Sequence, residues 1–158
     1  MVDTIDNPQI GEKVRLDAAY TDGLAYFSVG DRRYVKEPTE PFREARPADL
    51  HPMMTQCRTP NLLAEAGREF PDTNTAGEYV DALTCFDNIR IAAQIATDNN
   101  TSEPLRIRGI TQLRTAQTAT KKYYLETLRT IPTFGDMECL LDMDAQQIQD
   151  YLKRKQTT

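Results

Sequence analysis

The feature that most constrains the fold is a long stretch of helical character, residues 104–131, in which the charge of the chain reverses. Every charged residue between Pro104 and Leu125 is a cation, whereas the whole chain has a formal net charge of -5. Apolar residues recur along this stretch at helical spacing and form an interrupted stripe. The stretch is therefore predicted to be one basic helix. Its apolar stripe consists of Ile110, Leu113, Ala116, Tyr124, Leu128 and Ile131.

A second helical stretch precedes the basic one. It is predicted from about Ala76 to Asp98, after Thr75 and Glu78, which have the spacing of a capping box. Residues 98–104 form a polar turn of a length typical of an αα-hairpin. The two helices are therefore expected to lie antiparallel. The apolar face of the first helix consists of Tyr79, Leu83, Phe86, Ile89, Ala93 and Ala96.

The N-terminal third has a different pattern. Short runs within residues 13–37 alternate in β fashion and are separated by turn residues at 21–23 and at Gly30 and Asp31. They predict a small antiparallel meander. Prolines then recur through residues 37–60 and exclude a long helix there. This connector either wraps across its own domain or reaches onto a neighbouring subunit, and wrapping its own domain is favoured.

The predicted fold class is mainly α, with a long antiparallel helix hairpin, short flanking helices and a small N-terminal β meander. A length of 158 residues fits a single domain. Residues 1–36 form its arm and meander, 37–60 the Pro-rich connector, and 61–158 the helical part. Short helices are predicted at 61–70, at 135–141 and after Asp144, where Gln147 completes a second capping-box spacing.

The sequence gives little support to a catalytic or metal site. His51 is the only histidine, Ser28 and Ser102 are the only serines, and nothing marks an oxyanion hole beside them. The three cysteines are widely spaced and lack the pairing of zinc ligands. No glycine-rich loop suited to phosphate binding is present. The chain is therefore predicted not to be an enzyme, and no cofactor, metal or small-molecule substrate is indicated.

The basic helix is the predicted binding site. Its cations and interleaved threonines suit contacts to nucleic-acid phosphates. The same cations suit ion pairs with acidic groups of this chain or of a neighbouring copy, and the 24 acidic residues of the chain favour this interpretation. The candidate contact residues for an acidic partner or a nucleic acid are Arg90, Arg106, Arg108, Arg114, Lys121 and Lys122.

Two short motifs and a run of arginines carry a family resemblance. FPD at Phe70–Asp72 and FDNIR at Phe86–Arg90 precede a polar turn and an arginine-bearing helix that begins PLRIRGITQLR. This order resembles the coat proteins of helical RNA plant viruses, both rod-shaped and filamentous, over about residues 70–131. The β-like N-terminal third has no helical counterpart in the rod-shaped kind, and Asn-Ile-Arg stands in place of the x-x-Asn-Arg of that family. The resemblance implies a self-assembling shell subunit whose RNA-facing residues are Arg90, Arg106, Arg108 and Arg114.

The predicted function is a non-enzymatic structural or assembly subunit that acts through protein–protein contacts, in a virion as a capsid or head-tail protein. The alternative is a nucleic-acid-binding or regulatory module that uses the basic helix at 104–131. The expected partners are further copies in a homo-oligomer or larger assembly and, in the alternative, a nucleic-acid backbone. The sequence shows neither a secretory signal nor a membrane-spanning apolar run. A cytoplasmic location is expected, in host cytoplasm or in a virion.

Overall fold

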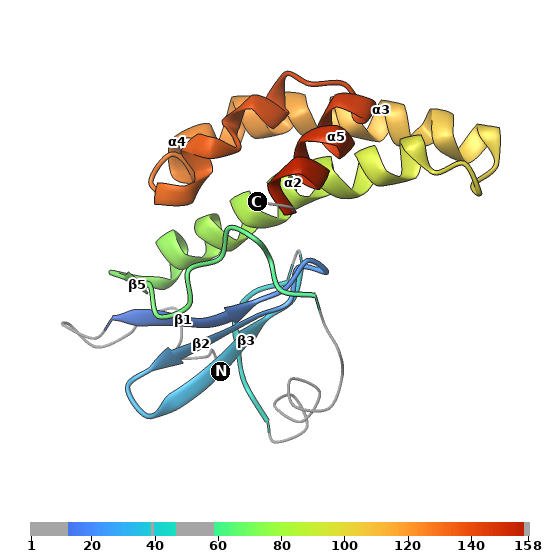
Figure 1. Ribbon diagram of the computed structural model, residues 1–158. Coiled ribbons are helices and arrows are strands. Elements are labelled where there is room, and N and C mark those ends of the chain that lie inside the picture. Colours follow the sequence, from blue (N-terminus) through green and yellow to red (C-terminus); the bar gives the residue numbers. More distant parts are fainter. Residues whose placement is uncertain (1–12, 39, 47–58, 157–158) are drawn as a thin grey trace. The chain divides into compact units, whose positions relative to one another are not determined.

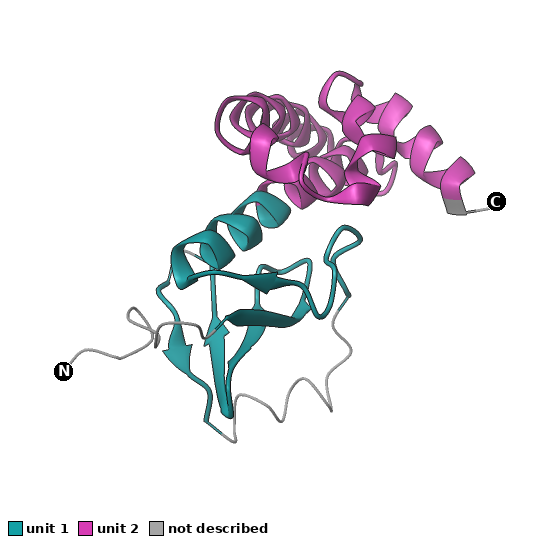
Figure 2. Ribbon diagram, turned by 90° about the vertical axis from the view of Figure 1, so that its left-hand side faces the viewer, with its two compact units in different colours: residues 1–84 teal, residues 85–158 magenta. Residues whose placement is uncertain are grey.

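The computed structural model describes residues 13–38, 40–46 and 59–156 (Figure 1). The chain divides into two compact units, residues 1–84 (unit 1) and 85–158 (unit 2), and the division falls inside helix α2 (Thr73–Thr97) (Figure 2). The N-terminal arm and most of the Pro-rich connector lie outside the described residues.

Unit 1 is built on a five-stranded antiparallel sheet (Figure 1). The strand order is β4-β3-β2-β1-β5, so β2 is the middle strand, and all of its residues are buried. The hairpin between β2 and β3 closes through Gly30, whose φ of 60° favours glycine. The strands are β1 (Val14–Ala19), β2 (Ala25–Val29), β3 (Arg32–Lys36), β4 (Arg43–Glu44) and β5 (Glu69–Phe70).

The first half of α2 covers one face of this sheet (Figures 1 and 2). The ring of Tyr79 packs against that of Phe70 in β5, with ring centroids 4.9 Å apart. Lys36 Nζ in β3 lies 3.2 Å from Asp81 Oδ1 of the helix. The helix begins earlier than the sequence predicts because Asp72 is its cap, and this carboxylate accepts a hydrogen bond from the Thr75 amide at 2.7 Å.

The prediction of a mainly α fold is wrong, because unit 1 contains a five-stranded sheet and not only a three-stranded meander. Strands β4 and β5 have two residues each, which is too short to show any alternation. A short helix is predicted at 61–70, but residues 61–68 form turns and loop, and the last two residues are strand β5. Asn61 Oδ1 accepts a hydrogen bond from the Leu63 amide at 3.0 Å, and this local bond favours a turn over a helix. The chain is an α+β protein.

Unit 2 is helical. After the second half of α2 come α3 (Glu103–Ala119), a π-helical turn η2 (Thr120–Tyr124) and α4 (Leu125–Leu128). Two 3-10 turns follow, η3 (Pro132–Asp136) and η4 (Glu138–Leu141), in place of the predicted helix at 135–141, and α5 (Ala145–Gln156) ends the described chain. The core side chains with almost no exposure include Ile89, Leu113, Leu128, Ile131, Phe134, Leu140 and Ile148.

The basic stretch is therefore not one regular helix. It is interrupted at Thr120, which is completely buried and whose hydroxyl donates to the Ala116 carbonyl at 2.7 Å. The Thr120 hydroxyl also lies 3.2 Å from the Cys85 sulfur of α2. Hydroxyl groups that bond to the preceding turn distort helices, and a π turn inserts an additional residue. The interruption coincides with a contact between helices that the spacing of apolar residues does not reveal.

Gly109 marks a close approach of α3 to the backbone of α2. A Cβ atom at this position would lie 3.0 Å from the Ala96 nitrogen and 3.2 Å from the Ala92 oxygen. Because both atoms belong to the backbone, they cannot turn aside as a side chain can. Glycine at this position lets α3 lie directly on α2.

We expect Gly109→Val to lower the free energy of unfolding by about 2 kcal/mol, because overpacking that cannot be relieved costs about this much. Urea denaturation followed by circular dichroism measures the loss. Gly135→Val is the matched control, since a Cβ at Gly135 has nothing within 4 Å. Equal losses in the two variants would show that α3 does not depend on the small residue at 109.

Candidate functional site

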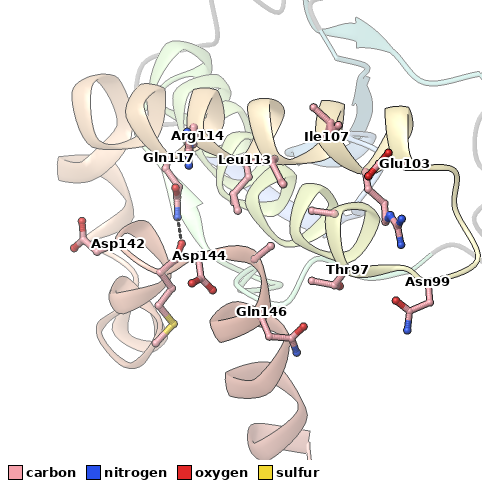
Figure 3. A pocket seen from close by; sticks show the side chains of 15 residues that line it. Thr97, Asn99, Glu103, Ile107, Leu113, Arg114, Gln117, Asp142, Asp144 and Gln146 are labelled. Carbon is pink, nitrogen blue, oxygen red and sulfur yellow. Dashed lines mark hydrogen bonds between the residues drawn. The ribbon is translucent and has the colours of Figure 1, made fainter.

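A groove of about 750 Å³ runs along one face of α3 in unit 2 (Figure 3). One wall is α3 from Glu103 to Gln117, and the other residues come from the C-terminal end of α2, the turn after it and residues 142–146. The groove is lined by Ala96, Thr97, Asn99, Glu103, Arg106, Ile107, Ile110, Leu113, Arg114, Gln117, Asp142, Met143, Asp144, Ala145 and Gln146.

The α3 wall is apolar along its middle and charged beside it. Leu113 is buried, whereas Ile107 and Ile110 keep 56% and 40% of their surfaces exposed. The two isoleucines and Leu113 occupy successive turns of one helical face. Arg106 and Arg114 line the same groove, each within one turn of Ile110. A face of this kind combines an apolar strip with two cations.

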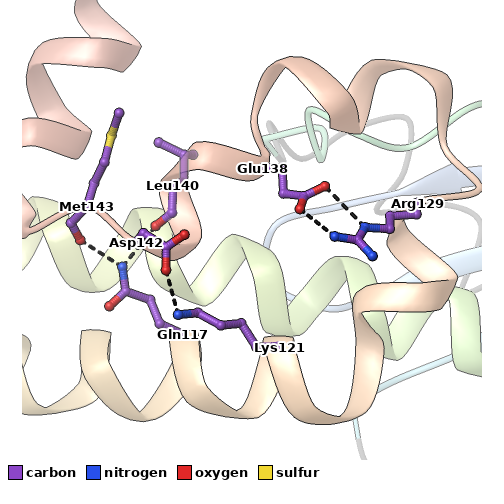
Figure 4. Close-up of polar contacts among 7 residues, drawn as sticks. All are labelled: Gln117, Lys121, Arg129, Glu138, Leu140, Asp142 and Met143. Carbon is purple, nitrogen blue, oxygen red and sulfur yellow. Dashed lines mark hydrogen bonds and ion pairs between the residues drawn. The ribbon is translucent and has the colours of Figure 1, made fainter.

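The opposite wall is held in place by Gln117. Its side-chain Nε2 donates hydrogen bonds to the carbonyl oxygens of Leu140 and Met143, both at 2.8 Å (Figure 4). Lys121 Nζ, one turn further along the chain, pairs with Asp142 Oδ1 at 2.6 Å (Figure 4). These contacts tie residues 140–143 to the helical stretch that forms the first wall, so the groove is bounded by fixed elements on both sides.

The start of α5 completes this wall. The Asp144 amide donates to Gln147 Oε1 and the Gln147 amide donates to Asp144 Oδ1, each at 2.9 Å. This reciprocal arrangement is the capping box that the sequence predicts. The Asp144 carboxylate is thereby engaged within its own helix.

The structure separates the six predicted contact residues into groups. Arg106 and Arg114 line the groove, while Arg108 lies exposed on α3 outside it. Lys121 is paired with Asp142, and Lys122 Nζ lies 5.2 Å from the centroid of the exposed Tyr123 ring.

Arg90 lies on α2 and forms an ion pair with Asp87. Arg90 Nε donates to Asp87 Oδ1 at 3.0 Å, and Nη2 contacts the same oxygen. Asp87 is 4% exposed, and its other oxygen, Oδ2, has no hydrogen-bond partner among the described residues. Burial raises the pKa of the Asp87 carboxyl, and the hydrogen bond and charge of Arg90 oppose that rise. In the structure, Arg90 compensates a buried charge.

The arginines of the groove are differently placed. Neither Arg106 nor Arg114 forms an ion pair with any residue that the structure describes. Further along the chain, Arg129 after α4 donates to Glu138 at 2.7 and 3.3 Å (Figure 4). The hydrogen bond and charge of Arg129 lower the pKa of the Glu138 carboxyl. Lys121 and Arg129, which form ion pairs within the described chain, thus lie in the second half of the basic stretch. In its first half, the hydrogen bonds of Asn100 and Thr101, together with the charge of Arg106, lower the pKa of the Asp98 carboxyl.

No match emerges from comparisons with known family models, curated proteins or solved structures. The resemblance to coat proteins of helical RNA plant viruses remains a prediction from sequence motifs. The groove and the residues around it are the features of the structure that bear on function.

Within the described ranges, no group of three or more His, Cys, Asp or Glu side chains is placed to hold a metal ion. The same ranges contain no helix with both the length and the apolar character needed to cross a membrane. His51 lies outside the described residues. What the groove offers chemically is an apolar surface with charged groups beside it, which suits binding.

Sequence reasoning missed the apolar part of the groove. The sequence places Ile110 on the inward stripe, yet it is 40% exposed at the groove, and Ile107 is not part of the predicted stripe. The signal is present in the sequence, because Ile107 is a large apolar residue three positions before Ile110 and continues the predicted stripe toward the start of the helix. Gln117 gave no such signal, since its partners are backbone carbonyls more than twenty residues away.

Proposed function

We propose that the chain is a non-enzymatic structural or assembly subunit that acts through protein–protein contacts. The observation that carries the proposal is the groove on α3, where Ile107 and Ile110 remain 56% and 40% exposed beside two arginines without ion pairs in the described chain. Protein interfaces combine a central apolar patch with a polar rim, and arginine is enriched in them. Covering this strip with another protein removes apolar surface from water, which favours association.

The composition of the groove favours a protein surface over a phosphate backbone. Glu103, Asp142 and Asp144 line the same groove as the arginines, and their negative charges oppose phosphate. Lys121 and Arg90 already meet carboxylates of this chain. The proposed setting is a larger assembly in the host cytoplasm or a virion, with the chain as a capsid or head-tail protein, and the sequence resemblance favours the capsid.

Light scattering combined with absorbance at 260 and 280 nm tests this proposal on protein purified at low salt from cells that make it. We expect particles heavier than one chain, with the absorbance ratio of protein alone. Ile107→Ser is expected to reduce the mass of the particles, because it replaces an exposed apolar side chain of the groove. A clean monomer would contradict the proposal, and copurified nucleic acid would favour the nucleic-acid-binding alternative.

A further inference from the structure

Four exposed residues of the groove form one strip along α3. Ile107 and Ile110 lie at its centre, and Glu103 and Arg114 lie at its two ends. All four residues line the groove (Figure 3). Their spacing of four, three and four residues places them on one face of the helix, over roughly 16 Å of its length. Two helices pack side by side along a seam with this spacing.

The two ends of the strip carry opposite charges. Neither Glu103 nor Arg114 forms an ion pair with a residue in the described part of the chain. An antiparallel pair of α3 helices can place Ile107 of each copy against Ile110 of the other. The same register brings Glu103 opposite Arg114 at both ends of the pair, because these two residues lie equally far from the middle of the strip. A parallel pair would bring like charges together, which is unfavourable.

The remaining charges of the groove are engaged within their own chain. Asp142 Oδ1 lies 2.6 Å from Lys121 Nζ, and the Asp144 carboxylate accepts a hydrogen bond at the start of α5. The charge of Arg106 acts on the Asp98 carboxyl of the turn before α3. Positive and negative groups thus both line the groove, and they do not select a partner of one charge sign. What distinguishes the partner is the order of the charges along the strip.

Self-complementarity identifies the occupant as a second copy. A two-fold symmetric dimer requires a surface that matches itself, and on this strip each isoleucine faces an isoleucine and each end charge faces its opposite. The other exposed large apolar side chains of the described chain lie off the strip, Leu105 on another side of α3 and Leu62, Ile91 and Tyr123 on other segments. The segments 1–12 and 47–58, outside the described ranges, do not combine two apolar residues with opposite charges at the spacing of the strip.

We propose that two copies of the chain associate through an antiparallel pair of α3 helices, in which the strip of one copy covers the strip of the other. The inference rests on the proposed function, since it treats the groove as a protein-contact surface, and it goes further by naming the occupant and the register. A strip of about three turns buries less area than a standard interface of about 1,600 Å². We therefore expect a reversible dimer with a dissociation constant on the order of micromolar.

Sedimentation velocity of the full-length chain at low salt measures this dissociation constant, over concentrations that extend below and above the micromolar range. Glu103→Arg and Arg114→Glu each place like charges opposite one another at both ends of the pair. Each substitution is expected to raise the dissociation constant about ten-fold. Ile107→Ser is expected to raise it about thirty-fold, because both copies lose an apolar contact at the centre of the strip.

A mixture of the two charge variants is the most specific test. In an antiparallel mixed pair, the charge introduced at position 103 of one copy faces the opposite charge introduced at position 114 of the other. The second end of the pair retains Arg114 from one copy and Glu103 from the other. We therefore expect the equimolar mixture of Glu103→Arg and Arg114→Glu to dimerise as the wild type does, although each variant alone is about ten-fold weaker. One chain that carries both substitutions is expected to regain the wild-type constant for the same reason.

Two substitutions on other sides of α3 are the matched controls. Arg108→Glu reverses an exposed cation that does not line the groove, and Leu105→Ser removes an apolar side chain that is 45% exposed and also outside it. Both variants are expected to dimerise as the wild type does. Circular dichroism melts establish that all variants are folded before their dissociation constants are compared.

Several outcomes would overturn the inference. These are a chain that stays monomeric at every concentration, as when another segment of the chain covers the strip, a dissociation constant that neither charge variant changes, and a mixture that dimerises no better than its components. Particles heavier than one chain whose mass does not respond to these substitutions would remove the inference and leave the proposed function standing. Dimers that show the charge rescue but copurify with nucleic acid would support the pairing and favour the nucleic-acid-binding alternative.

Discussion

Replacing Phe134 with alanine is expected to lower the free energy of unfolding by about 4 kcal/mol. Phe134 in η3 is completely buried, and its ring packs edge-on against Phe86 of α2, with centroids 5.2 Å apart. Truncation of a buried aromatic side chain removes its transfer free energy and leaves a cavity, at a cost of about 3–5 kcal/mol. Loss of the aromatic pair adds to this cost. Urea denaturation followed by circular dichroism at 222 nm measures the change.

The Phe134→Ala variant also tests whether the core around η3 holds one wall of the groove in place. Phe134 lies in η3, and η4 follows it along the chain. The two turns lead directly to residues 142–146, which form one wall of the groove. We therefore expect Phe134→Ala to reduce assembly in light scattering together with stability, although Phe134 does not line the groove. Tyr123→Ala is the control, because this ring is 66% exposed and its loss is expected to change the unfolding free energy by less than about 0.5 kcal/mol. Equal effects of the two aromatic substitutions would contradict the assigned core.

The parts of the fold that the sequence predicted are those specified by local chemistry. Strands β1 to β3 have alternating residues and turn glycines, and the Asp144 and Gln147 cap of α5 depends on residues three positions apart. Strands β4 and β5 exist only because two-residue segments find partners at the edges of β3 and β1. Pairing between segments distant in sequence leaves no periodic signal. For this reason the prediction of a mainly α fold is wrong.

The distinction between local signals and contacts distant in sequence also applies to the basic stretch. Its composition and helical character are evident from the sequence, but the break lies at Thr120, which contacts Cys85 of another helix. The partners of its cations were equally hidden, since Asp142 reaches Lys121 from a later segment. Sequence reasoning identified Arg106 and Arg114 as candidates by charge alone. The exposed isoleucines between them, which define the groove, became visible only once the buried face of α3 was known.

The Arg90→Gln substitution is expected to lower the free energy of unfolding by about 3 kcal/mol at pH 7. Asp87 is almost completely buried, and Arg90 supplies the opposite charge and the hydrogen bonds that its Oδ1 accepts. Removing one partner of such a pair leaves a buried charge without compensation, which costs about 3–5 kcal/mol. We expect the lower end of this range because Arg90 retains 24% side-chain exposure.

The loss of unfolding free energy in Arg90→Gln is expected to depend on pH. Burial raises the pKa of Asp87 in the folded protein above its ordinary value of 3.8, so the folded state holds the proton more tightly than the unfolded state does. The contribution of this group to stability therefore falls as pH rises from the unfolded pKa through the folded pKa. Removing Arg90 raises the pKa of Asp87 in the folded protein further. The pH range over which this group loses its contribution to stability therefore extends to higher pH. The difference in unfolding free energy between wild type and Arg90→Gln should be largest near pH 7 and small near pH 4.

The double variant Asp87→Asn with Arg90→Gln separates the electrostatic cause from a general packing defect. It lacks the titrating carboxyl, so its stability is expected to improve relative to wild type as pH rises from 4 to 7, opposite in sign to the change in Arg90→Gln. Arg90→Gln also discriminates between the two roles considered for this arginine. A phosphate-facing arginine would change the salt dependence of RNA binding and leave stability intact. Because Arg90 is the counter-charge of Asp87, we expect a pH-dependent loss of stability and no change in that salt dependence.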